Sequence, residues 1–153
     1  MPNWCMNQMT VSHESPQELE LLFESMKKCQ TLNDYVKPIP SESNEDWFTE
    51  RVNTWGTKWE PDMSGMHLDL ENKTISGGFD SAWAPPMGLF YALEEKRFEV
   101  SAMWLEPGLG FYGSYYEGFD TTEDFYNLKD LPYKIYEAFN CHDWVCEEDN
   151  DQA

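Results

Sequence analysis

The chain has few basic residues. Its 153 residues include 10 lysines and arginines against 29 aspartates and glutamates, which gives a formal charge of -19. This charge repels phosphate at long range and gains nothing from counterion release on nucleic acid. We therefore expect no direct binding of DNA or RNA, and we expect any partner to be a protein with a basic surface. Solubility alone is the other explanation of the charge.

Long apolar runs are also missing, as is an N-terminal basic segment followed by an apolar stretch. These absences predict no contact with a membrane and no secretion. The cysteines are few and scattered, unlike the dense frameworks of small secreted domains. We expect reduced thiols in a cytoplasmic protein. The four are Cys5, Cys29, Cys141 and Cys146.

Motifs of known enzymes are absent as well. His13, His67 and His142 lie in different parts of the chain, and there is no glycine-rich phosphate loop, nucleophile elbow or zinc-protease helix. We therefore expect no cofactor. An enzyme remains an alternative, but we favour a protein without catalytic activity.

One short stretch, "CHDWVC", could hold part of a metal site. It brings Cys141, His142 and Cys146 close together, and Cys5 or Cys29 could complete four ligands. The spacing matches no standard zinc pair, and an unpaired cysteine is usually a small buried hydrophobe. We expect no metal here.

Aromatic residues are plentiful. They make up 16% of the chain, with seven tryptophans, and the hydrophobic fraction is 41%. A disordered acidic chain would lack them, so the sequence predicts a folded protein. The length suits one domain, which we place at residues 1–140, with an insertion at about 29–62 and an acidic C-terminal tail at 141–153.

The periodicity of apolar residues predicts an α+β fold. Alternation indicates strands at 3–12, 66–70, 74–79 and 98–104, and a helical spacing follows both Pro16 and the double proline at 85–86. Ser15 and Glu18 suit the start of the first helix. Strand-helix-strand-strand-helix-strand is the ferredoxin-like order, with two helices on one face of an antiparallel sheet.

Three further segments complete the predicted fold. Residues 29–52 show no period and predict a loop, with one helical turn around 45–51. Residues 111–119 predict an added C-terminal hairpin strand. Residues 131–144 predict a closing helix that presents Ile135, Tyr136 and Phe139.

The run "WGTKW" at 55–59 places Lys58 between two tryptophans. Our preferred interpretation is one aromatic layer between the sheet and the insertion, with Lys58 stacked on a ring. The alternative is a surface platform for a base, although the basic surroundings of such platforms are missing. The layer would contain Trp4, Trp55, Trp59, Trp83 and Trp104.

Glu106 is the carboxylate that we single out, because it ends a predicted strand beside a Pro-Gly turn. We expect its carboxylate to accept hydrogen bonds from the turn amides or to pair with Lys58. We favour these structural roles over general acid or base chemistry. A second hypothesis for function is a small nucleotide-handling enzyme with Lys58 and Glu106 in a cleft. The candidate binding residues are Trp55, Lys58, Trp59, Trp83 and Glu106.

Four fragments together resemble a known family: "MPNWCMN", "WGTKW", "FDSAWAPP" and "EPGLGFYG". The chain resembles the YubB-type ferredoxin-like domain family, small proteins of bacteriophages and plasmids, over roughly residues 1–119. Ser81 stands where that pattern has threonine, and Ser12 and His13 replace a glycine. The residues that carry the resemblance are Asn3, Trp4, Cys5, Asn7, Trp55, Gly56, Thr57, Lys58, Trp59, Phe79, Ala82, Trp83, Pro85, Pro86, Glu106, Gly108, Phe111 and Gly113.

The resemblance implies a ferredoxin-like fold and an origin in a phage or another mobile element, and it implies no activity. Together with the charge, it favours an interaction protein that binds and modulates a host protein, as a nucleic-acid mimic or an anti-defence factor. Exposed charges mainly steer encounter with a partner. We expect the C-terminal tail to do this through Glu147, Glu148, Asp149 and Asp151.

Overall fold

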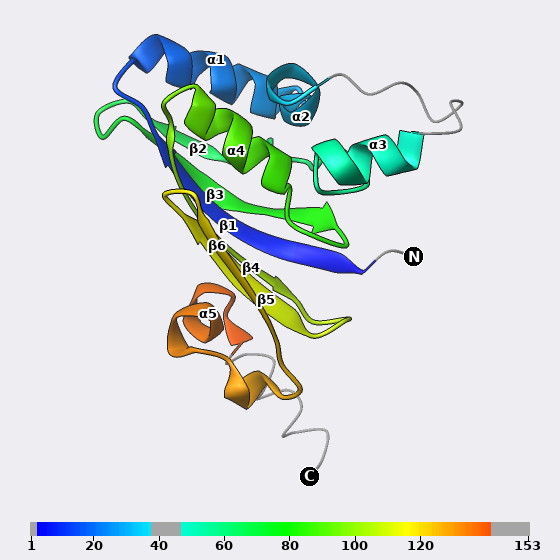
Figure 1. Ribbon diagram of the computed structural model, residues 1–153. Coiled ribbons are helices and arrows are strands. Elements are labelled where there is room, and N and C mark those ends of the chain that lie inside the picture. The colour runs from blue at the N-terminus through cyan, green and yellow to red at the C-terminus, as the bar shows by residue number, and fades with distance from the viewer. Residues whose placement is uncertain (1–2, 38–46, 142–153) are drawn as a thin grey trace.

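A six-stranded antiparallel sheet forms the centre of the protein (Figure 1). The computed structural model describes residues 3–37 and 47–141. The strand order is β2-β3-β1-β4-β5-β6, and every neighbouring pair is antiparallel. The strands are β1 (Trp4–Ser12), β2 (His67–Asp69), β3 (Thr74–Ala82), β4 (Glu99–Glu106), β5 (Phe111–Tyr116) and β6 (Phe119–Asp124).

Helices lie on both sides of this sheet. Figure 1 shows α1, α2, α3 and α4 on one side and α5 on the other. Within the described ranges, none of the helices has the length and apolar character needed to cross a bilayer. The helices are α1 (Pro16–Lys27), α2 (Thr31–Tyr35), α3 (Trp47–Thr54), α4 (Met87–Glu95) and α5 (Tyr133–Ala138), with a 3₁₀ turn, η1, at Leu128–Asp130.

The main core lies between the sheet and α1 and α4. Ser15 begins α1 as predicted, because its hydroxyl accepts the backbone N–H of Glu18 at 3.4 Å. The apolar stripes of both helices face the sheet from the same side, which confirms the predicted α+β layering. The buried members of the stripes are Leu19, Leu22 and Met26 from α1 and Leu89, Phe90 and Leu93 from α4.

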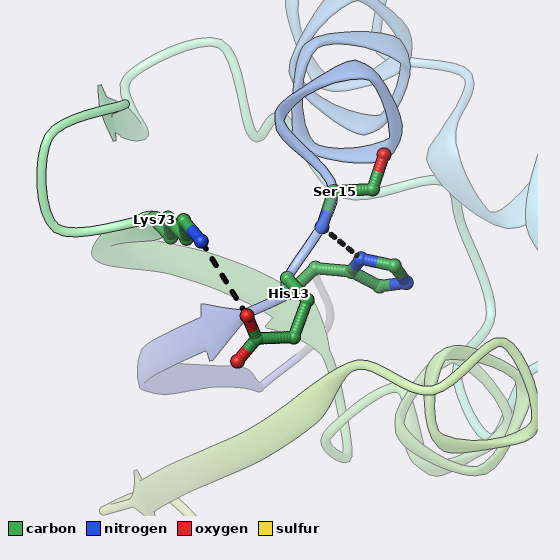
Figure 2. A network of polar contacts seen from close by, with 4 residues as sticks. His13, Ser15 and Lys73 are labelled. Carbon is green, nitrogen blue, oxygen red and sulfur yellow. Dashed lines mark hydrogen bonds and ion pairs between the residues drawn. The ribbon is translucent and has the colours of Figure 1, made fainter.

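His13 holds the turn between β1 and α1 (Figure 2). The Ser15 backbone N–H donates to its Nδ1 at 2.9 Å, so Nδ1 is unprotonated and Nε2 carries the proton. Nε2 then donates to the Lys96 carbonyl at 3.0 Å, and the ring packs edge-on against Phe98. His13 therefore has a structural role in this turn.

A smaller core packs between the opposite face of the sheet and α5. It contains Ile135 and Phe139, as predicted for the closing helix, together with Leu105 and Leu131. Cys141 is fully buried in the same cluster. The rest of the expected tail, residues 142–153, lies outside the described residues.

Two regions of the chain differ from the prediction. The insertion, predicted as a loop with one turn at 45–51, contains α2 and the eight-residue α3. β6 was not predicted, because all six of its residues are exposed and show no alternation. It extends the sheet beyond the single added strand that the sequence predicts at β5.

Candidate functional site

Four aromatic rings surround the ammonium group of Lys58. Two of them, Trp47 and Phe48, come from α3, and the others come from the segments before and after the β2-β3 hairpin. A fifth ring, Trp4, lies 6.1 Å from Trp59. We call these five rings with Lys58 the aromatic cluster. The distances from Lys58 Nζ to the ring centres are 4.5 Å for Trp59, 5.5 Å for Trp83, 5.8 Å for Phe48 and 6.0 Å for Trp47.

The backbone around residues 56–58 is fixed from three sides. Gly56 has a φ of +86°, and a Cβ atom there would lie 2.8 Å from the Met87 nitrogen, so glycine is required. The Thr57 hydroxyl donates to the Ala82 carbonyl at 2.8 Å. Arg51 donates to the Lys58 carbonyl at 3.2 Å. These contacts hold the run against the start of α4 and place the Lys58 amine among the rings.

Trp83 has a left-handed backbone conformation, with a φ of +73°. For a residue other than glycine this costs about 1–3 kcal/mol, and such strain is often found at functional sites. The Trp83 N–H donates to the Asn3 carbonyl at 2.8 Å, which holds the conformation from the β1 side. The turn is braced further by Ser81, whose hydroxyl donates to the Ala84 carbonyl at 2.6 Å and accepts from Asn7.

The tryptophans do not form the single layer that the sequence favoured. Trp55 and Trp104 are in the main core, whereas Trp4 and Trp83 are each 46% exposed. Trp4 precedes Cys5 on β1, and alternation therefore turns it to the face opposite the core. The prediction of one layer was wrong: Trp83 lies over the Lys58 ammonium group and Trp4 lies beside Trp59.

Glu106 has the structural role that was preferred for it. Its side chain is fully buried and accepts the backbone N–H groups of Gly108 at 2.9 Å and Leu109 at 2.6 Å. It closes the turn between β4 and β5. Burial, and secondarily the charge of Glu106, raise the pKa of Cys5 to about 12, so this thiol stays protonated and unreactive.

A cavity of about 720 Å³ lies next to the aromatic cluster. Its lining includes Trp4, Trp59 and residues 138–140, where α5 ends and the chain continues. Three carboxylates line it: Glu60, Asp62 and Asp80. We call this cavity the acidic groove. Neither Lys58 nor Glu106 lines it.

The carboxylates of the acidic groove differ in their surroundings. Burial raises the pKa of Glu60 to about 7, against the lowering effect of the Leu32 and Asn33 amides that donate to it. Burial also raises the pKa of Asp80. Hydrogen bonds from Ser64 lower the pKa of Asp62. At neutral pH, Asp62 is therefore charged, whereas Glu60 is near its midpoint.

Sequence reasoning missed several members of this site. Trp47 and Phe48 were treated as part of a loop, although an aromatic pair in an acidic insertion was a signal that could have been used. Glu60, Asp62 and Asp80 could not be selected among the many carboxylates without the fold. Within the described residues, no group of three or more His, Cys, Asp or Glu side chains could hold a metal. His142 and Cys146 of the "CHDWVC" stretch lie outside those residues.

Comparison with known proteins identifies no relative of this chain. The chain matches no protein-family model, no curated protein and no solved structure.

Proposed function

We propose that the chain is an interaction protein, encoded by a phage or another mobile element, that binds and modulates a host protein through a basic surface of that protein. The observation that carries the proposal is the aromatic cluster, partly exposed and adjacent to the acidic groove. Exposed tryptophans that cluster in this way are typical of binding hot spots. The formal charge of -19 supplies the complementary field for a basic partner.

Strand order supports a ferredoxin-like frame for this site. The element sequence β1-α1-β2-β3-α4-β4 and the strand order β2-β3-β1-β4 support the split βαβ arrangement that we propose. We propose that α2 and α3 are insertions into this frame and that β5, β6 and α5 extend it.

The fragments that resemble the YubB-type family meet at one end of the sheet. Asn3 bonds to Trp83, and Thr57 bonds to Ala82. Gly108 approaches Asn3 so closely that a Cβ atom would lie 2.6 Å from the asparagine oxygen. Four fragments far apart in the sequence thus build one local structure next to the aromatic cluster. This convergence supports a shared binding role for the family pattern.

Nucleic-acid mimicry is one form of the proposal. In this form, the basic surface of the host protein is a groove that normally binds DNA or RNA, and the acidic chain occupies it. Competition between the chain and a nucleic acid for the captured partner distinguishes this form from binding elsewhere on the partner. We expect removal of residues 147–153 to slow association, because exposed charges steer encounter.

The test is capture of a partner from bacterial lysate by the immobilised chain at low and high ionic strength. We expect one basic protein to bind at low ionic strength and to be lost at high ionic strength. Trp83→Ala should abolish capture, whereas Tyr126→Ala, which truncates a fully exposed ring elsewhere, should leave it unchanged. Equal capture by both variants, or no selective capture, contradicts the proposal.

The enzyme hypothesis gains no support from the geometry, because Lys58 lies over rings and Glu106 closes a turn. Failure to capture any partner, combined with a rise in melting temperature on adding a nucleotide, would favour it over the interaction protein.

A further inference from the structure

Strand β3 is much longer than its outer neighbour β2. The β2 pairing covers only residues 74–76, by the pairs Asp69 with Thr74 and His67 with Ser76. β3 continues to Ala82. Among the described residues, no strand pairs with the outer edge of β3 beyond Ser76.

Two hydrogen bonds show which backbone groups point to that edge. His13 N–H donates to the Lys73 carbonyl, and Trp83 N–H donates to the Asn3 carbonyl. Both bonds join β1 to odd-numbered positions on the β3 side. Because bonding direction alternates along an antiparallel strand, the N–H and C=O groups of Gly78 and Asp80 point away from β1. They have no hydrogen-bond partner within residues 3–37 and 47–141.

The far end of the open edge is closed. The Ala82 carbonyl, also at an even-numbered position, accepts the Thr57 hydroxyl at 2.8 Å. This bond agrees with the assigned direction of the even-numbered groups. The open edge therefore lies between β2 and Thr57, and its unpaired groups belong to Gly78 and Asp80.

The two residues that carry these unpaired groups, Gly78 and Asp80, line the acidic groove, and both are exposed. An exposed strand edge is a template for pairing with another chain, and soluble proteins usually block it. In this protein, residues of that edge line the same cavity as Trp59, Glu60 and Asp62. The cavity volume of about 720 Å³ is within the range of ligand-binding sites.

We propose that an extended segment of the partner protein, bearing lysine or arginine, binds in the acidic groove as an added strand on the edge of β3 at Gly78 and Asp80. The inference deepens the proposed function and rests on it. Backbone hydrogen bonds to the edge provide affinity, and alternate side chains of the segment provide specificity. Its cationic groups pair with the carboxylates of Asp62 and Asp80.

The charge of the chain favours a cationic partner segment over a second copy of the chain as the added strand. Pairing two edges would bring two chains of formal charge -19 together, with the same carboxylates opposed. Like charges placed together at an interface are strongly unfavourable. A cationic segment removes that repulsion.

Amide exchange measured by NMR tests the inference, with a synthetic peptide of alternating lysine and valine as the probe. On addition of the peptide, exchange of the Gly78 and Asp80 amides should slow by roughly tenfold or more. The Phe79 and Ser81 amides already face β1 and should not change, so they are internal controls. A peptide that fails to bind, or that leaves Gly78 and Asp80 unchanged, overturns the inference.

Two peptides that are N-methylated at alternate residues test the strand geometry without altering the protein. Only every second residue of an added strand points its N–H to β3. One of the two peptides, methylated at either the lysines or the valines, should lose binding and the other should keep it. Equal binding by both would overturn the added-strand geometry.

Reversing a charge in the acidic groove tests whether the bound segment is cationic. Asp80→Lys should weaken binding of the lysine-valine peptide by roughly tenfold. Glu20→Lys makes the same change of charge on an exposed residue of α1 and should have a much smaller effect. Equal effects of the two variants would overturn the assignment.

Amide exchange measured with the captured partner in place of the peptide shows whether the added strand or the proposed function fails. If Trp83→Ala abolishes capture but the partner does not slow exchange at Gly78 and Asp80, the function holds and the added strand is wrong. Formation of a dimer of the chain, with protection of the same two amides in the absence of peptide, would assign the edge to a second copy and also overturn the inference.

Discussion

The ammonium group of Lys58 lies 4.5 Å from the centre of the Trp59 ring. The two residues are neighbours in the sequence, yet the contact requires a turn that Gly56 permits and that Thr57 fixes. A cation held on tryptophan in this way is stabilised by about 0.5–2 kcal/mol, depending on its exposure.

Replacing Lys58 tests this contact. Lys58→Met keeps most of the side chain and removes the charge, so we expect the free energy of unfolding to fall by about 0.5–2 kcal/mol. Lys134→Met, at an exposed position on α5, is the matched control and should change it by less than about 0.5 kcal/mol. Urea unfolding provides the measurement. Equal losses in the two variants would show that the rings do not stabilise the ammonium group.

Truncation of the two tryptophans in the 55–59 run should have different costs. Trp55 is 3% exposed, and its indole N–H donates to the Lys37 carbonyl at 2.9 Å, so Trp55→Ala should cost about 3–5 kcal/mol. Trp59 is half-buried, and Trp59→Ala should cost clearly less. Urea melts of both variants measure the difference. A larger loss for Trp59→Ala would mean that this ring belongs to the core, as the sequence first suggested.

Glu60 should make stability depend on pH. Its pKa is raised by burial from 4.5 to about 7, so the folded chain binds a proton more tightly than the unfolded chain. Its contribution is therefore fully present below pH 4.5 and is lost as the pH rises through about 7. We expect Glu60→Gln to reduce the fall in the free energy of unfolding across this window. Glu20→Gln, at an exposed site, should leave the fall unchanged.

Replacing Glu106 distinguishes a structural role of its carboxylate from a catalytic role. Glu106→Gln leaves only one acceptor oxygen for two turn amides and should lower the free energy of unfolding by about 1.5–3 kcal/mol. Thermal and urea unfolding measure this loss. If stability is unaffected and a nucleotide-dependent activity disappears, Glu106 has the chemical role that the structure does not support.

The parts of the fold that could be predicted have strong local signals. The Ser15 cap is a local hydrogen bond to the Glu18 N–H. The apolar stripe of α1 and the alternation in β1 and β4 each reflect burial of one face in a single core. β6 lacked such a signal because its six residues are all exposed, and its pairing with β5 is a tertiary property. Only one turn of α3 was predicted, because this helix has no buried residue to mark its face.

The site was predicted only in part, for a related reason. Lys58, Trp59 and Trp83 were selected from composition and resemblance, but their exposure depends on turns. The left-handed conformation of Trp83 is imposed by the Asn3 and Ser81 contacts, which join distant segments. The unpaired groups of Gly78 and Asp80 depend on where β2 ends, which alternation within β3 does not reveal.

The affinity of the captured partner for three forms of the chain tests the central claim most directly: wild type, Trp83→Ala and Tyr126→Ala. The account predicts that Trp83→Ala weakens binding by at least about thirtyfold, as expected for a hot-spot residue, while urea unfolding shows that the variant is still folded. Tyr126→Ala should bind like the wild type. Equal affinities of all three forms would contradict the claim that the aromatic cluster beside the acidic groove is the binding site.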